Sequence, residues 1–202
     1  MMKPVTATTG TVAGWPPSVL RDMALGAVAG AAGVWVMDRV GWFMYDYEDR
    51  DAVAQELRAR RGGDDVEFTP AEASARQDQD QPGTPGKDVA HVAVEKAARL
   101  TAATLPTAQP NPAGIAMHYG LGILPGALHA VLRRKVPAVG AGAGALYGAG
   151  LFVVNDEIVA PVLGLASGPM QYPWQAHARG LVAHTVLGVV TETVLRAADR
   201  AR

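Results

Sequence analysis

Cysteine is absent from the 202-residue sequence, which excludes disulfides, thiolate metal sites and a cysteine nucleophile. An excess of charge is also lacking, because 18 basic and 19 acidic residues leave a formal net charge of −1. That balance gives no reason to expect a nucleic-acid partner. Aromatic residues make up only 6% of the chain, whereas hydrophobic residues make up 49% and glycines number 23. This large share of apolar and small residues has to be buried in a protein core or in a bilayer.

The few charges are unevenly distributed along the chain. They are dense between Asp46 and Arg99 and scarce between Gly114 and Val190, which indicates one aqueous and one apolar environment. A polar N-terminal tail, residues 1–22, precedes the first apolar segment. Charged and aromatic residues follow that segment in place of the small residues of a cleavage site. We therefore expect an uncleaved membrane anchor.

Four segments have the length and apolarity to cross a bilayer, which requires roughly 20 residues in a helix. They are residues 23–45, 114–132, 136–154 and 176–195. The third contains no charged residue, and a soluble buried helix of that length and uniformity is uncommon. The sequence predicts an all-α, polytopic membrane bundle with a first helix at 23–45. A three-helix membrane region at 113–196 and a basic tail at 197–202 complete it.

Residues 46–112 form a polar, partly helical insert outside the membrane. A short charged helix is predicted to end before Gly62 and Gly63, and "TPAE", residues 69–72, fits a helical capping box. Residues 88–105 predict an amphipathic helix that rests on the membrane surface or against the bundle. The residues of its apolar face are Val89, Val92, Ala93, Ala97 and Leu100.

The orientation prediction rests on the short turn Arg133-Arg134-Lys135, because short basic loops favour the cytoplasmic side. Arg196, Arg200 and Arg202 at the C-terminal end agree with it. We expect a multi-pass protein of the bacterial inner membrane with both termini in the cytoplasm. The insert and the connection at 155–175 would then lie outside.

Glycines recur at four-residue spacing within three of the predicted spans. Gly140, Gly144 and Gly148 form the longest such series, with shorter ones at Gly26/Gly30 and Gly122/Gly126. Such stripes let two helix backbones approach closely. The triple predicts either tight packing within one chain or a contact with a second copy or another membrane partner.

Polar residues form stripes on the second and fourth spans. His177, His184 and Thr191 fall within about 40° of one another on a helical wheel, with Glu192 about 60° from His177. His118 and His129 are nearly eclipsed on the second span. Charged groups in lipid are costly, so these side chains should face the bundle interior.

The ionisable residues also sort by their expected depth in the membrane. The expected outer group is Asp38, Arg39, His118, Asp156, Glu157, His177 and Arg179. The expected inner group is Arg21, Asp22, His129, Glu192 and Arg196, with His184 between the two.

Asp156 and Glu157 raise the sharpest question, because they follow the apolar third span. They could form an ion-paired structural lock with Arg39, Arg179 or His177, which is the usual fate of charges near a membrane. They could belong to a proton or ion path, since histidine titrates near neutrality. A metal site with His118 and His177 is the third interpretation, although no HxxH or HExxH spacing supports it.

The last third of the chain resembles the YagU-like bacterial inner-membrane proteins, a family of unknown function. The residues that carry the resemblance are Glu157, Pro161, Gly164, Leu165, Pro173, Trp174, His184, Gly188, Thr191 and Glu192. The first span and "AMHYGLG" are similar more loosely. The resemblance implies a multi-pass helical membrane protein and a role in acid tolerance.

The functional prediction is a non-enzymatic membrane protein with a pH-responsive polar interior that handles protons or ions. The alternative is a structural or assembly subunit that packs a partner through its glycine faces. An enzyme is disfavoured because no Ser-His-Asp order, P-loop or metal motif is present. We expect no cofactor and no metal, and a lipid bilayer as the main partner.

Overall fold

The computed structural model describes residues 16–60, 89–101, 103–104 and 112–201. These residues are 87% helical and include no strand, which confirms the predicted all-α class. Four helical segments are long and apolar enough to cross a membrane: α1 (Pro17–Asp46), α5 (Pro112–Leu132), the composite segment Pro137–Val162, and α8 (Trp174–Arg200). α1 begins within residues 1–22, which were predicted to be a polar tail.

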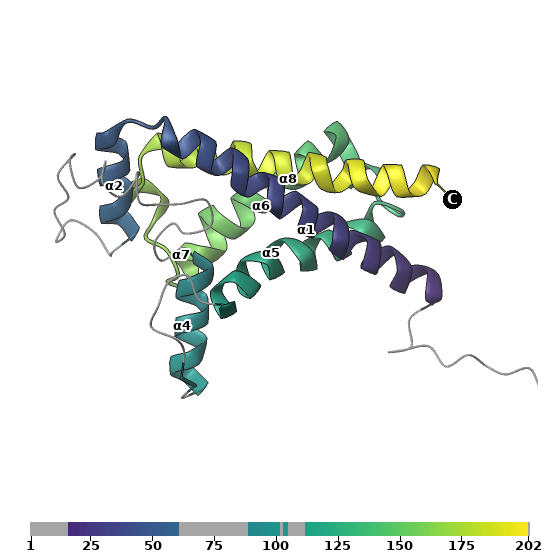
Figure 1. Ribbon diagram of the computed structural model, residues 1–202, viewed down its shortest axis with the longest axis horizontal. Helices are drawn as coiled ribbons and strands as arrows, with labels where there is room; N and C mark the ends of the chain where they lie inside the picture. Colours follow the sequence, from purple (N-terminus) through teal and green to yellow (C-terminus); the bar gives the residue numbers. More distant parts are fainter. Residues whose placement is uncertain (1–15, 61–88, 102, 105–111, 202) are drawn as a thin grey trace, which may run out of the picture.

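α1 is the central helix of the bundle. It packs against both α5 and α8 and crosses them in Figure 1. Glycines make the contact with α5 close, because a Cβ atom on Gly30 would lie 2.5 Å from the carbonyl oxygen of Gly122. Gly26 meets Gly126 in the same way. The two shorter glycine series therefore face each other across one helix pair.

The third span is not the uninterrupted helix predicted at residues 136–154. It begins with the 3₁₀ segment η2 (Pro137–Gly144), continues as α6 (Ala145–Phe152) and the π-helical turn η3 (Val153–Val159), and ends with α7 (Ala160–Val162). The backbone turns between η2 and α6, where Gly142, Ala143 and Gly144 have φ values of 59°, 55° and 93°. Glycine adopts this left-handed conformation without strain, so the small residues that suggested a helix also permit the break.

Asp156 and Glu157 consequently lie inside a helix, not at its end. The helix continues past them to Val162 through the widened turn η3. Pro161 follows four residues after Glu157 and has no N–H to donate to that carbonyl, which favours an irregular turn at this point. The expectation that these carboxylates mark the end of the third span is therefore wrong.

Two helices of the insert are described. α2 (Arg50–Arg60) confirms the predicted short charged helix, and α4 (Val89–Thr101) lies within the predicted amphipathic helix. α4 packs on α5 through Ala90, His91 and Ala98, whereas Leu100 on the predicted apolar face is 82% exposed. The bundle thus contacts the side of α4 that carries His91, whose ring lies directly against Gly114. Of the two placements expected for the apolar face, contact with the membrane surface stays a prediction. The capping box at residues 69–72 lies outside the described residues.

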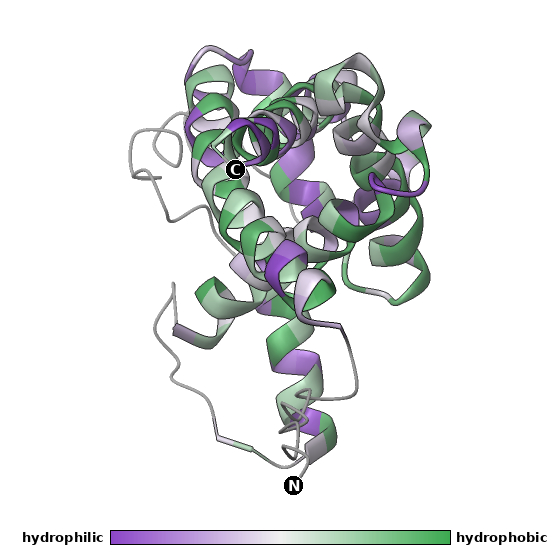
Figure 2. Ribbon diagram, turned by 90° about the vertical axis from the view of Figure 1, so that its right-hand side faces the viewer, coloured by the Kyte–Doolittle hydropathy of each residue, from purple (hydrophilic) through white to green (hydrophobic). Residues whose placement is uncertain are grey.

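The outward surfaces of the spans are apolar. Figure 2 shows hydrophobic residues around much of the bundle, and Val28, Leu124 and Leu146 are 66%, 73% and 60% exposed. Such side chains on the outside of long apolar helices indicate contact with a lipid bilayer. α2 extends beyond one end of the bundle (Figure 1).

Candidate functional site

The polar residues of the spans gather in two separate places, one toward each end of the bundle. The first lies where α1 begins and α8 ends, and the second where α1 ends and α8 begins. This division matches the inner and outer groups predicted from the sequence. Which group faces the cytoplasm stays a prediction.

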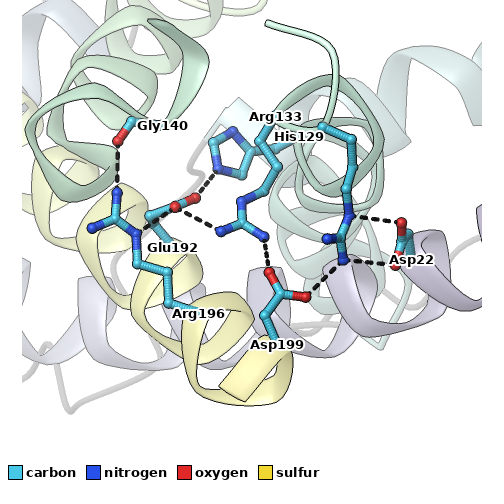
Figure 3. Close-up of polar contacts among 8 residues, drawn as sticks. Asp22, His129, Arg133, Gly140, Glu192, Arg196 and Asp199 are labelled. Carbon is cyan, nitrogen blue, oxygen red and sulfur yellow. Dashed lines mark hydrogen bonds and ion pairs between the residues drawn. The ribbon is translucent and has the colours of Figure 1, made fainter. Parts of the chain in front are cut away.

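Glu192 is the centre of the first group, and we call Glu192, His129, Arg133 and Arg196 the Glu192 cluster (Figure 3). Its Oε2 lies 2.8 Å from His129 Nε2, and its Oε1 accepts hydrogen bonds from Arg133 at 2.9 Å and Arg196 at 2.7 Å. Arg196 also donates to the carbonyl oxygen of Gly140 at 3.1 Å. One carboxylate therefore joins α5, the turn after it, η2 and α8.

A chain of ion pairs extends the Glu192 cluster to α1. Arg133 also donates to Asp199 at 2.7 Å, and Asp199 accepts from Arg134, which in turn binds Asp22 at 2.9 Å (Figure 3). Asp22 belongs to the start of α1 and Asp199 to the end of α8. The two arginines that suggested membrane orientation thus also hold the ends of three helices together.

Close backbone packing separates the two polar groups. A Cβ atom on Gly144 would lie 2.8 Å from the carbonyl carbon of Gly188, and one on Gly148 would lie 2.8 Å from that of His184. On the other side of α8, Thr191 packs against α1 and is fully buried. The three glycines predicted for helix packing, Gly140 included, all lie against α8 of the same chain. The backbones of the third span and α8 are therefore in direct contact between the two groups.

The second group consists of three histidine–carboxylate pairs. His118 on α5 lies 2.8 Å from Asp38 on α1, and His177 on α8 lies 2.6 Å from Glu157 in η3. His184 is 3.7 Å from Asp156, too far for a hydrogen bond, and instead donates from Nδ1 to the carbonyl of Gly180. The widened turn η3 therefore presents two adjacent carboxylates to α8.

The two ring nitrogens of His177 both face acceptors. Nδ1 meets the Glu157 carboxylate at 2.6 Å, and Nε2 lies 3.0 Å from the carbonyl oxygen of Pro169. Neutral imidazole has only one N–H, so both hydrogen bonds can form only with the doubly protonated ring or with a protonated Glu157 that donates to Nδ1. His129 differs, because only its Nε2 has a hydrogen-bond partner and its buried Nδ1 has none.

A cavity of about 300 Å³ lies beside this group. Histidine, acidic and arginine residues that line it are His118, Asp156, Glu157, His177, Glu56, Arg60 and Arg179. Phe152 and Tyr172 add aromatic surface. An adjoining cavity of about 160 Å³ is lined by Asp38 and His184. We call the larger space the histidine cavity. It lies at the end of the bundle that carries α2.

Arg179 has different partners from those predicted. It binds Glu48 and Glu56, at 2.6 Å to Glu56 Oε1, and Glu56 also accepts from Arg60 at 2.6 Å. Arg39, another predicted partner of the outer carboxylates, donates to the carbonyl of Trp35 on its own helix. Of the three proposed locks for Asp156 and Glu157, only the one with His177 is present.

The electrostatics around Glu56 depend on burial and on two cations. Burial opposes its charge, but Arg60 and Arg179 outweigh burial and hold its pKa below the ordinary value. Burial dominates at Glu48 and raises its pKa despite the attraction of Arg179. The spacing of Glu56 and Arg60 could have indicated an i,i+4 pair, whereas nothing in the sequence connects either residue to α8.

The metal interpretation gains no support from this geometry. Within the described ranges, no group of three or more histidine or acidic side chains is arranged to hold a metal ion. Comparison of the chain with family models, curated proteins and solved structures found no match.

Proposed function

We propose that this chain is a non-enzymatic, multi-pass membrane protein that binds a proton at the histidine cavity and changes the structure there with pH. A bacterial inner-membrane location, the relation to YagU-like proteins and cytoplasmic termini are parts of the same proposal. The observation that supports it most is that each ring nitrogen of His177 lies within hydrogen-bond distance of an acceptor oxygen. Protonation of that ring satisfies two hydrogen bonds at once.

Loss of the proton would release one of the two bonds of His177. The ring connects α8 to the Glu157 carboxylate in η3 and to Pro169 in η4 (Pro169–Gln171). Both Pro169 and Glu157 line the histidine cavity. The proposed response to rising pH is therefore a loosening of the η4 wall of this cavity.

Other charged and titratable groups around the cavity would shape this titration. They are Glu157 and Asp156 from η3, His118 from α5, Glu56 and Arg60 from α2, Arg179 from α8 and Tyr172 after η4. With both histidines neutral, three carboxylates face two arginines, whereas two imidazolium rings would make the lining net positive.

The closed packing along α8 supports a response at one end of the membrane over a continuous proton path. Gly144 and Gly148 contact the α8 backbone directly between His184 and Glu192. The alternative of a structural or assembly subunit has its best support in the Glu192 cluster, whose two carboxylate oxygens are both bonded. The glycine triple does not support a partner surface, because it is occupied within the chain.

A spin label next to Pro169 tests the proposal. Met170 is 95% exposed, and the chain has no cysteine, so Met170→Cys gives one labelling site in η4. In nanodiscs, label mobility should rise as pH is raised. His177→Gln should abolish this transition. His129 belongs to the Glu192 cluster, so the control variant His129→Gln should leave the transition in place.

Two results would contradict the proposal. Label mobility that is independent of pH in the unsubstituted chain would remove the conformational response. Vesicles with a trapped pH dye and an imposed pH gradient provide the second measurement. A steady proton flux that depends on His177 would show a conducting path across the membrane, in place of a response confined to one end of the bundle.

A further inference from the structure

A groove lies on the side of the third span that faces away from α8, and it is separate from the histidine cavity. It has a volume of about 420 Å³ and is lined by Ala138, Val139, Leu146, Gly150, Leu151 and Val154, together with Tyr147. We infer that it holds an acyl chain of an anionic phospholipid whose headgroup is bound by Lys135 and Arg196. This inference is independent of the proposed pH response.

The break in the third span creates the groove. η2 and α6 meet at the left-handed residues Gly142 to Gly144, so the two pieces do not form one straight cylinder. α6 packs mainly on α8, and Leu146 on its free side is 60% exposed. Gly150 leaves open space, since nothing lies within 4 Å of a Cβ built on it. An apolar cleft within a membrane-spanning segment is a natural site for a hydrocarbon chain.

Two cations adjoin the η2 residues of this groove wall. Arg133 and Arg134 are engaged by Asp199, Glu192 and Asp22, but exposed Lys135 has no ion pair with any described residue. Lys135 comes three residues before Ala138 in the groove wall. It is thus the cation of the basic turn that is available to an external anion.

Arg196 provides a second positive charge beside η2. Its Nη2 donates to Gly140, the neighbour of Val139, and its Nε donates to Glu192 (Figure 3). Its side chain is 45% exposed, and its Nη1 has no partner among the described residues. A phosphate between Lys135 and Arg196 would gain roughly 1 kcal/mol per cation, a factor of about five in affinity.

Charge also decides between a lipid and a second copy of the chain as the occupant. A two-fold contact through this groove would bring Lys135 and Arg196 of both copies to the same region. Like charges would then repel across the interface. An anionic phospholipid fits both the apolar wall and the cations.

Thermal unfolding in non-ionic detergent with added lipid tests the inference. Phosphatidylglycerol should raise the unfolding midpoint, and phosphatidylcholine with the same acyl chains should raise it much less. Lys135→Gln should weaken phosphatidylglycerol binding roughly fivefold. Arg200→Gln, which removes an exposed cation from the end of α8, should not.

A second pair of variants tests the groove itself. Gly150→Leu fills it, whereas Gly120→Leu adds the same side chain on α5, where a Cβ also meets nothing within 4 Å. Only Gly150→Leu should abolish the lipid effect. Equal stabilisation by both lipids, or an effect that survives Gly150→Leu, would overturn the inference. So would a concentration-dependent dimer that Gly150→Leu dissociates, because a second copy would then occupy the groove.

Discussion

His129 and Glu192 join α5 to α8 in the interior of the bundle, with Nε2 and Oε2 2.8 Å apart. The two residues are 1% and 2% exposed, and the His129 ring also stacks on Tyr147 with 4.1 Å between ring centroids. The pair is thus part of a packed contact that extends to α6. Glu192 was expected to find a partner among His129 and Arg196, and it binds both.

Glu192→Gln should destabilise the protein by about 3 kcal/mol, because it removes the carboxylate that binds Arg133, Arg196 and the buried His129. Unfolding in mixed detergent micelles, followed by circular dichroism, measures this loss. The pH response of a label at Met170 should keep its midpoint, since the two polar groups are separated by packed backbone. A folded Glu192→Gln protein that has lost this pH response would identify Glu192 as a proton carrier.

Gly148→Ala should cost about 2 kcal/mol or more, because the added methyl group overlaps the α8 backbone at His184. Gly150→Ala on the same helix is the matched control. Its methyl group enters open space, and alanine favours helix over glycine by about 1 kcal/mol. Unfolding midpoints should therefore shift in opposite directions. Equal effects of the two substitutions would contradict the assignment of this glycine face to α8.

Ala143→Gly should stabilise the protein by about 1 kcal/mol. Ala143 has a φ of 55°, a left-handed conformation that costs a residue with a Cβ roughly 1–2 kcal/mol. Ala145→Gly is the control, because Ala145 has the helical values φ −59° and ψ −41° and should lose about 1 kcal/mol. If Ala143→Gly is destabilising to the same extent as Ala145→Gly, the third span is a continuous helix with no break between η2 and α6.

The helices and the division of the polar residues could be predicted because both follow from local chemistry. Long apolar segments need helices, and charges in lipid need partners, so Glu192 and His129 could be matched by depth alone. The break at Gly142 could not be predicted in the same way. Its glycines are compatible with a tightly packed helix and with a turn, and only the contact with α8 decides between them.

The partners of Arg179 could not be predicted from the sequence either. From the sequence, Glu157 is the nearer acidic residue in the same connection, yet Arg179 binds Glu48 and Glu56 more than a hundred positions away. That choice depends on how α2 lies on the end of α8, which follows no local pattern. The π-helical turn at Glu157 also depends on its surroundings, although Pro161 was a usable signal.

Reporter fusions test the orientation of the bundle. The start of α1 and the end of α8 share one membrane face, because Asp22 and Asp199 bind the same guanidinium, that of Arg134. A reporter after Arg202 should be cytoplasmic, and one near Gln81 in the insert should be extracytoplasmic. The reverse pattern would show that the arginines of the insert, and not the turn at Arg133, set the topology.

The pH dependence of stability should differ in sign between Glu56 and Glu48. The pKa of Glu56 is lowered in the folded protein. Its stabilising contribution is therefore fully present above the unfolded glutamate pKa of about 4.3 and is lost as pH falls through the folded pKa. The advantage of the unsubstituted chain over Glu56→Gln should thus be largest at neutral pH, at about 3 kcal/mol, and should shrink in acid.

The pKa of Glu48 is raised by burial, so its protonated form is favoured in the fold. The advantage over Glu48→Gln should then decrease as pH rises through the folded pKa. Urea unfolding of the three proteins across the acid range measures both slopes. Parallel slopes for the two variants would show that Arg179 and Arg60 do not discriminate between the two carboxylates as described.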